Sequence, residues 1–195
     1  MSNARTLADL MGTSTTVPSS KLSLGAADMP SGSVLQVKNI SDGAEKAPTL
    51  SSNKAYTGYS IVLDNNLQST SSFIILMTSL FVGVVQNTTL ALNWSSSNTT
   101  LTRLNPATDS VNDFTTTEVY PGGSTNRNGM GCSFVKKIDV SSVTPATYYL
   151  WITEAAGTQP YINSSSNGNE AASLGPSGYW VGSGTTSITA MEIAG

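Results

Sequence analysis

The chain has 195 residues, which suits one domain of about 150 residues with an appendage and is short for two full domains. Charged residues make up only 11% of it, and the net charge is -3. Nearly all Lys and Arg residues are scattered singly, so no basic stripe could neutralise a run of phosphates, and nucleic acid is excluded as an expected partner. The chain contains no His, which excludes His bases, Ser-His-Asp and Cys-His nucleophiles and His metal sites.

The remaining reactive residues form no recognisable catalytic or metal-binding motif. Cys132 is the single cysteine, so no intramolecular disulfide can form, and its apolar neighbours favour a core thiol over a reactive one. The acids are dispersed, and only Asp109, Asn112 and Asp113 are spaced so that they could touch one cation; a solvated loop is the favoured alternative. We therefore predict no catalytic residue, no metal site and no cofactor.

Nothing in the sequence resembles a targeting or membrane segment. The first residues alternate between polar and apolar types without a continuous apolar stretch. We therefore expect no secretory signal peptide, and we expect the protein to be made in a cytoplasm. The longest apolar run, Phe73–Val85, is shorter than the about 20 residues of a membrane helix. We predict a buried strand there and no membrane partner.

Residues 1–32 differ from the rest of the chain in having too few apolar residues for a core of their own. Near the start, three apolar residues recur at helical spacing, which predicts a short helix that cannot be stable alone. The following residues are polar and extended, with isolated apolar positions. We predict an arm that docks on another surface. The residues expected to make this contact are Leu7, Leu10, Met11, Val17 and Leu22.

From residue 33 onward, short apolar or alternating segments are separated by turn residues. Strands are predicted at 34–38, 59–63, 73–85, 89–94, 116–120, 132–140, 147–153, 160–163 and 187–193. Residues 126–131 predict a turn whose backbone needs positive φ. Because no helical period separates the strands, residues 33–195 are predicted to form an all-β, jelly-roll-like antiparallel β-sandwich.

The apolar and aromatic residues predict which strands are central. Phe73, Ile75 and Met77 lie in the most apolar strand and Trp151 lies in the second most apolar one. We therefore expect Ile75 and Trp151 to be almost fully buried and to face the same interior. Tyr179 and Trp180 follow a Gly-Pro-Ser-Gly loop, so exposed rings there are a candidate carbohydrate platform. Ordinary packing or an intersubunit contact is the favoured alternative for these two rings.

Five Asn-x-Ser/Thr sequons occur in the chain. They lie at Asn39, Asn87, Asn93, Asn98 and Asn163. Because the chain is rich in Asn, Ser and Thr and lacks a signal peptide, we interpret these sequons as chance matches rather than glycosylation sites.

Several segments resemble one family, in the expected order along the chain. The segments are residues 3–11 (NARTLADLM), 13–20 (TSTTVPSS), 29–37 (MPSGSVLQV), 72–77 (SFIILM), 161–164 (YINS) and 186–194 (TSITAMEIA). They resemble fibre-like structural proteins of tailed bacteriophages, especially marine and cyanobacterial ones. This resemblance implies a virion component with a jelly-roll-like body, generally homotrimeric, that is attached through its N-terminus and has no catalytic residues.

The rest of the sequence limits the kind of virion component that is expected. Residues 86–130 match nothing in this family, and no heptad or Gly-x-y repeat is present to form a shaft. We therefore expect a short fibre knob, a head fibre or a capsid-decorating protein on the virion surface, made in the host bacterial cytoplasm. Its expected partners are two further copies of itself and other proteins of the capsid or tail.

Two alternatives belong to other functional classes. One is a tail-tip receptor-binding adhesin that recognises host-surface carbohydrate through Tyr179 and Trp180. The other is an enzyme such as a depolymerase, which needs two carboxylates about 5 to 10 Å apart. The sequence alone cannot place two acids at that separation, so a non-enzymatic structural protein is the favoured interpretation.

Overall fold

The fold was analysed in a computed structural model of the whole chain. The structure describes residues 29–63, 67, 69–85, 89–104, 112–117, 127–142, 146–155, 159–164 and 184–195. Leu7, Leu10, Met11, Val17, Leu22, Tyr179 and Trp180, which were predicted as contact residues, lie outside these ranges. Within them, no helix is long and apolar enough to cross a membrane.

The described residues form β-strands joined by turns and loops. The strands are β1 (Val34–Asp42), β2 (Lys54–Val62), β3 (Phe73–Val85), β4 (Thr89–Ser95), β5 (Phe114–Thr117), β6 (Arg127–Asp139), β7 (Thr147–Glu154), β8 (Tyr161–Ile162) and β9 (Thr186–Ile193). Each predicted strand overlaps one of them. The predicted turn at 126–131 is wrong for the residues from Arg127 onward, which belong to β6 and pair with β3. The many glycines suggested a turn, but Gly131 in fact lies opposite Phe81 in a regular ladder.

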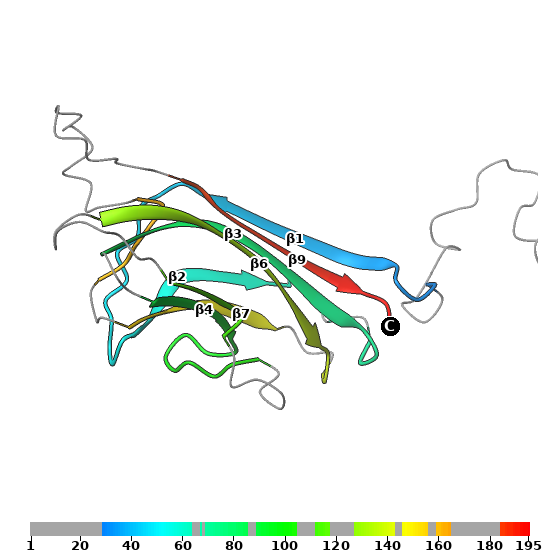
Figure 1. Cartoon of the computed structure of the whole chain (residues 1–195). Helices are drawn as coiled ribbons and strands as arrows, with labels where there is room; N and C mark the ends of the chain where they lie inside the picture. The colour runs from blue at the N-terminus through cyan, green and yellow to red at the C-terminus, as the bar shows by residue number, and fades with distance from the viewer. Residues whose placement is uncertain are drawn as a thin grey trace, which may run out of the picture.

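The strands form two antiparallel sheets that pack face to face (Figure 1). The first sheet has the order β1-β9-β3-β6, with β8 pairing to β3, and the second has the order β2-β7-β4-β5. The pairs are nested: β1 pairs with β9, β2 with β7, β3 with β6 and β4 with β5. A long antiparallel hairpin that is rolled up into two sheets gives this nesting, which is the strand order of a jelly roll. The predicted fold class is therefore confirmed.

The core lies between the two sheets, where alternate residues of every long strand point inward. The largest fully buried side chains are Ile61, Leu63, Ile74, Leu76, Leu90, Leu92, Trp94, Leu150, Ile152, Ile162, Ile188 and Glu154. They come from both sheets, as two-layer packing requires. Because successive side chains of a strand point to opposite faces, the inward residues of β3 are the even-numbered ones.

The prediction for Ile75 is therefore wrong. Ile75 is half-buried, and with Phe73 and Met77 it points away from the core, while its neighbours Ile74 and Leu76 are fully buried. The strand is apolar on both faces, so its composition indicated a buried strand but did not indicate which of the two alternating sets faces inward.

Trp151 is buried, as predicted, but it does not share the interior of the sandwich. It lies on the outer face of the second sheet, opposite Tyr56 in the pairing of β2 with β7. Its indole nitrogen donates a 2.7 Å hydrogen bond to the carbonyl of Ser97, in the loop after β4. The loop thus covers the ring from outside, and the tryptophan of the core is Trp94 instead.

The two sheets are joined along their β5–β6 side by one ion pair and one ring contact. Lys136 Nζ lies 2.7 Å from Asp113 Oδ1, and both side chains are largely buried. The other carboxylate oxygen of Asp113 accepts a 2.7 Å hydrogen bond from the backbone nitrogen of Trp94. Beside them, Phe114 and Phe134 stack with their ring centroids 5.8 Å apart. These contacts place β5 against β6 and close this side of the core.

Candidate functional surfaces

The described residues contain no group of three His, Cys, Asp or Glu side chains that could hold a metal ion. The suggested cation site does not form around Asp113, whose carboxylate is bound by Lys136 and the Trp94 backbone. The favoured alternative, a solvated loop, is also wrong at this position because Asp113 is largely buried. Asn112 accepts a 2.8 Å hydrogen bond from Arg103, and Asp109 lies outside the described residues.

Cys132 is buried in the core on β6, as its apolar neighbours predicted. Burial disfavours the thiolate and raises the pKa of Cys132 to about 11. Because the thiolate is the nucleophilic form, this cysteine has the properties of a structural residue and not of a catalytic one.

Two of the five sequon asparagines serve the fold. Asn163 is almost fully buried at a positive φ of 63°, and its amide nitrogen donates to the carbonyls of Asp42 and Ala44 at 2.8 and 3.0 Å. Its amide oxygen accepts a 2.9 Å hydrogen bond from the Thr186 hydroxyl. Asn93 is fully buried on β4. Neither amide is accessible to a glycosyltransferase in the folded chain, which agrees with the interpretation of these sequons as chance matches.

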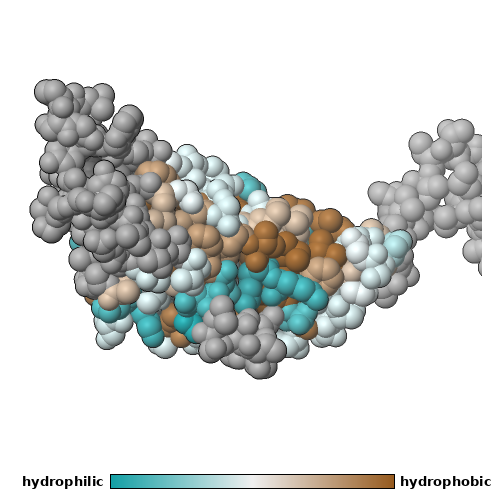
Figure 2. Space-filling view, in the orientation of Figure 1, coloured by the Kyte–Doolittle hydropathy of each residue, from teal (hydrophilic) through white to brown (hydrophobic). Residues whose placement is uncertain are grey.

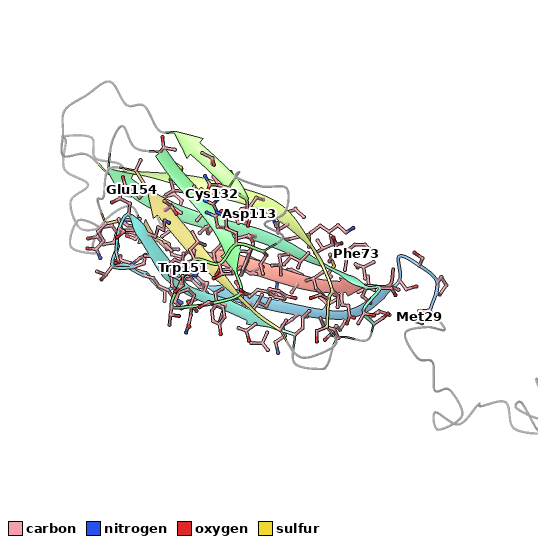
Figure 3. All side chains as sticks on the ribbon, turned by 90° about the horizontal axis from the view of Figure 1, so that it is seen from below. Met29, Phe73, Asp113, Cys132, Trp151 and Glu154 are labelled. Carbon is pink, nitrogen blue, oxygen red and sulfur yellow. The ribbon has the colours of Figure 1, made fainter. Side chains whose placement is uncertain are left out.

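An aromatic cluster occupies the outer face of the second sheet. The rings of Tyr56 and Tyr149 meet edge to face with centroids 5.6 Å apart, and Tyr56 also lies 6.4 Å from the Trp151 ring. Trp151 belongs to this face, whereas Cys132 lies in the core; both are labelled in Figure 3. Both tyrosines are half-buried, so part of each ring is open to solvent. Exposed tyrosine rings with polar neighbours are suited to stack against a sugar.

A cleft of about 570 Å³ lies where β6 ends and β7 begins. Arg103 and Tyr148 line it together with Ser96, Thr102, Ser141 and other residues of these loops. Its lining mixes hydroxyl groups, the guanidinium of Arg103 and the carboxylate of Asp139 with apolar side chains such as Ile138 and Val140.

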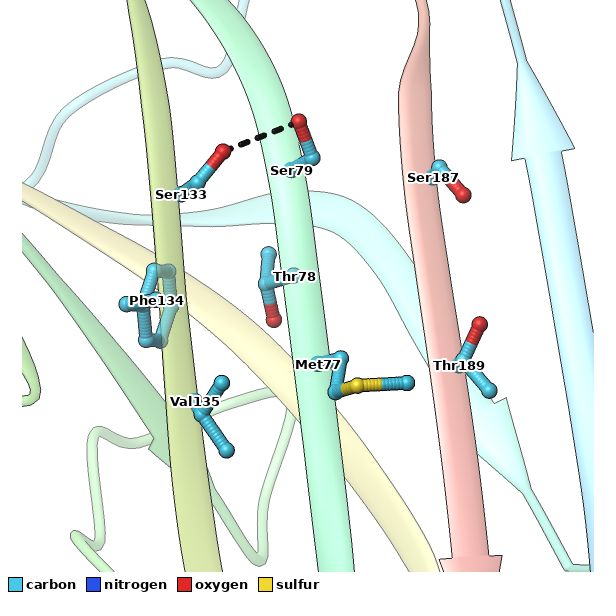
Figure 4. Close-up of a pocket in the computed structure, with 8 residues that line it drawn as sticks. All are labelled: Met77, Thr78, Ser79, Ser133, Phe134, Val135, Ser187 and Thr189. Atoms are coloured by element: carbon cyan, nitrogen blue, oxygen red, sulfur yellow. Dashed lines mark hydrogen bonds between the residues drawn. The ribbon is translucent and has the colours of Figure 1, made fainter.

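The outer face of the first sheet carries exposed apolar side chains, which is unusual for the solvent side of an antiparallel sandwich. Val135 is 62% exposed, Val37 is 56% exposed and Met77 is 38% exposed. In Figure 2 a brown, apolar area lies over the part of the view where β3, β6 and β9 run. A shallow hollow of about 410 Å³ lies in this face, and Figure 4 shows Met77 and Val135 beside Ser79, Ser133, Ser187 and Thr189 in its lining.

Neither of these outer surfaces was predicted from the sequence. Tyr56 lies outside the segment 59–63 that was predicted as a strand, and Tyr149 alternates with core residues of β7. For the face with Met77 a signal was present, because Phe73–Val85 is apolar at odd as well as even positions. A strand that is apolar on both faces, in a sandwich only two layers thick, must present one apolar face outward.

No protein-family profile and no curated protein matches the chain. Two solved structures similar to part of it come from infectious bursal disease virus. The structure of the Gx strain of that virus matches with a TM-score of 0.36 and 15% identity over 85% of this chain. The crystal structure of the VP2 subviral particle matches with a TM-score of 0.36 and 15% identity over 80% of this chain. The chain spans 33% and 40% of the lengths of those two proteins, respectively.

Proposed function

We propose that this chain is a non-enzymatic structural protein of a tailed-bacteriophage virion, a short surface appendage that assembles as a homotrimer. In this role residues 1–32 attach it to the capsid or tail, and the β-sandwich projects from the particle. The observation that carries the proposal is the nested jelly-roll pairing of β1 with β9 through β4 with β5. This is the architecture that the resemblance to phage fibre-like proteins implies, and it is shared by viral capsid domains.

The chemistry of the described residues supports a structural role. The buried acids serve the fold: Asp113 pairs with Lys136, and the fully buried Glu192 accepts a 2.7 Å hydrogen bond from Gln36. The one thiol is buried in the core. What the body offers at its surface is instead an apolar sheet face and an aromatic cluster, which suit contact with other molecules.

The place where the described chain begins also supports the proposal. The first described residues lie beside the C-terminal residues of the chain. The Gly32 backbone nitrogen donates a 2.8 Å hydrogen bond to the Ala194 carbonyl, and the Ala194 backbone nitrogen donates one to the Ser33 carbonyl. Figure 3 shows Met29 at one end of the sandwich and Glu154 at the opposite end. An arm that leaves from one end of an elongated body can hold the particle while the other end points outward.

Truncation tests this role of the arm. A chain without residues 1–30 is expected to fold as the full chain does, because the described core has no residue from that segment, but it should not bind to particles that lack the protein. The full chain should decorate the same particles. Full occupancy by the truncated chain would contradict the attachment role of the arm.

A second candidate function is an adhesin that binds host-surface carbohydrate. It is favoured by the half-exposed Tyr56 and Tyr149 rings on the outer face of the second sheet, in addition to the untested pair Tyr179 and Trp180. Tyr56→Ala should then abolish binding to host polysaccharide, whereas Val62→Ala, an exposed change in the same strand, should preserve it. Equal binding by both variants would remove the case for this cluster.

A further inference from the structure

One charged pair, Lys136 and Asp113, connects the two sheets of the sandwich. Lys136 lies on β6 of the first sheet, and Asp113 directly precedes β5 of the second sheet. The Lys136 Nζ atom is 2.7 Å from Asp113 Oδ1, and the two side chains are 13% and 8% exposed. Because Cγ of Asp113 is one bond away from Oδ1, Nζ lies within about 4 Å of that carbon, close to the about 3.5 Å of a near-attack contact.

Apolar side chains surround this pair and separate it from bulk water. Phe134 and Ile138, which flank Lys136 on the inward face of β6, both belong to or pack against the core. Phe114 follows Asp113 in the sequence, and its ring stacks on the Phe134 ring with the centroids 5.8 Å apart. Two charges that are taken out of water carry a desolvation cost that their mutual attraction repays only in part. A reaction that converts the two charges into one neutral amide removes this cost.

We propose that Lys136 and Asp113 become joined by an intramolecular isopeptide bond once the chain has folded. The Lys136 ammonium gives a proton to the Asp113 carboxylate, and the freed amine attacks Cγ to form the new C–N bond. One C–O bond of the carboxyl group then breaks. Of the three ammonium protons, one stays on the amide nitrogen and two leave with the oxygen as water. The step changes no oxidation state and needs no further reactant.

The backbone nitrogen of Trp94 is placed to assist this step. It donates a 2.7 Å hydrogen bond to Oδ2, the second carboxylate oxygen of Asp113. When the amine adds to Cγ, negative charge develops on the oxygen that the amide retains, and a fixed N–H donor in a site shielded from water stabilises that charge. Oδ1 lies beside the Lys136 ammonium, which supplies the protons, so Oδ1 is the oxygen that leaves. The two oxygens of Asp113 thus have different roles.

The bond closes a covalent ring between residues 113 and 136 and ties the first sheet to the second. Because the chain has a single cysteine, no disulfide can form such a link within it. A link between distant points of a chain restricts the unfolded state and thereby favours the folded one. The bond is independent of the virion role of the chain, so its absence would leave that role untouched.

The intact mass of the full chain, purified in its folded state and measured after denaturation, tests the bond. The wild-type mass should lie about 18 Da below the mass calculated from its sequence, because one water is lost. Lys136→Arg is the matched control, since a guanidinium keeps the positive charge beside Asp113 but stays protonated and cannot attack. Its mass should equal the calculated one.

Two outcomes of this measurement overturn the proposal. One is a wild-type mass equal to the calculated mass. The other is a deficit of the same size that persists in Lys136→Arg, because such a dehydration would lie elsewhere in the chain.

Tryptic peptides locate the bond in the sequence. Trypsin cuts after lysine and arginine but not after a lysine whose side-chain nitrogen is acylated. Residues 104–127 and 128–137 should therefore appear as one branched peptide, joined through Asp113 and Lys136. The pair Lys137–Asp139 is the internal control, because its atoms lie 3.3 Å apart but its side chains are 58% and 75% exposed. Trypsin should cut after Lys137 as usual. A separate peptide that ends at Lys136 as the main product overturns the proposal.

Discussion

The indole nitrogen of Trp94 donates a hydrogen bond to the hydroxyl of Thr78 across the core, over 3.1 Å. Trp94 belongs to β4 in the second sheet and Thr78 belongs to β3 in the first, and both are buried. This polar contact therefore links the two layers and adds a directional bond to apolar packing, which is non-directional.

Replacing Thr78 should reveal the contribution of this bond. Thr78→Val preserves the side-chain volume but leaves the indole N–H buried without an acceptor, so the free energy of unfolding should fall by about 1 to 3 kcal/mol. Thr78→Ser retains the hydroxyl and should cost less. Urea denaturation of the two variants checks this order, and an equal or larger loss in Thr78→Ser would mean that the methyl group matters at least as much as the bond.

The Asp113–Lys136 pair should contribute much more to stability than the Lys137–Asp139 pair on the same strand. Asp113→Ala removes the carboxylate that pairs with Lys136 and takes the acceptor from the Trp94 backbone N–H, and it should cost about 3 to 5 kcal/mol. Asp139→Ala breaks a pair whose side chains are mostly exposed, and it should cost at most about 1 kcal/mol. Thermal and urea unfolding measure both. Similar losses in the two variants would contradict the role of Asp113 in closing the core.

Neighbouring apolar residues of β3 should differ strongly in their effect on stability. Leu76→Ala removes a fully buried side chain and should cost about 2 to 5 kcal/mol. Ile75→Ala removes a half-exposed side chain of the outer face and should cost less than half of that in the monomer. The comparison is made by denaturation at a concentration where no oligomer forms. The reverse order would invalidate the assignment of inward and outward residues on this strand.

High pH should destabilise the fold through two buried groups. Burial raises the pKa of Cys132 from 9.0 to about 11, and burial together with the nearby Glu192 carboxylate raises the pKa of Tyr148 from 10.0 to about 12. The unfolded chain loses these protons first, so the stabilisation is complete below pH 9 and falls as pH rises to about 12. Each group should account for about 2 to 3 kcal/mol of that loss.

Two variants separate these contributions. In Cys132→Ala the decline in unfolding free energy between pH 9 and 11 should be smaller than in the wild type, and in Tyr148→Phe the decline between pH 10 and 12 should be smaller. The slopes against pH are compared, because each substitution also lowers stability at every pH. Slopes unchanged from the wild type would show that neither group titrates with the fold.

The architecture could be predicted from the sequence, but the choice of faces could not. Turn residues between short β-branched segments were enough to predict an all-β sandwich, because strand spacing is a local property. The inward face of Phe73–Val85 is decided by pairing with β6 and β9, which are distant in sequence. Trp151 is covered on the outer face by the loop after β4, whose Ser97 carbonyl accepts a hydrogen bond from the indole nitrogen. The strand pattern around Trp151 does not indicate this loop contact.

The candidate surfaces were missed for the same reason. Val37, Met77 and Val135 become one face only when β1, β3 and β6 join one sheet, and their separation in the sequence gives no sign of this. Tyr56 and Tyr149 meet because β2 pairs with β7. The predicted arm residues and the Tyr179–Trp180 pair stay predictions, since they lie outside the described residues.

The central claim, that this chain is a surface protein of a phage virion, is tested most directly by imaging intact particles by electron cryomicroscopy and fitting the sandwich to the density. The account predicts a threefold cluster of these jelly rolls on the capsid or tail, with the end that carries Met29 toward the particle and the end that carries Glu154 pointing away. Purified particles without the chain, shown also by mass spectrometry of their proteins, would contradict it.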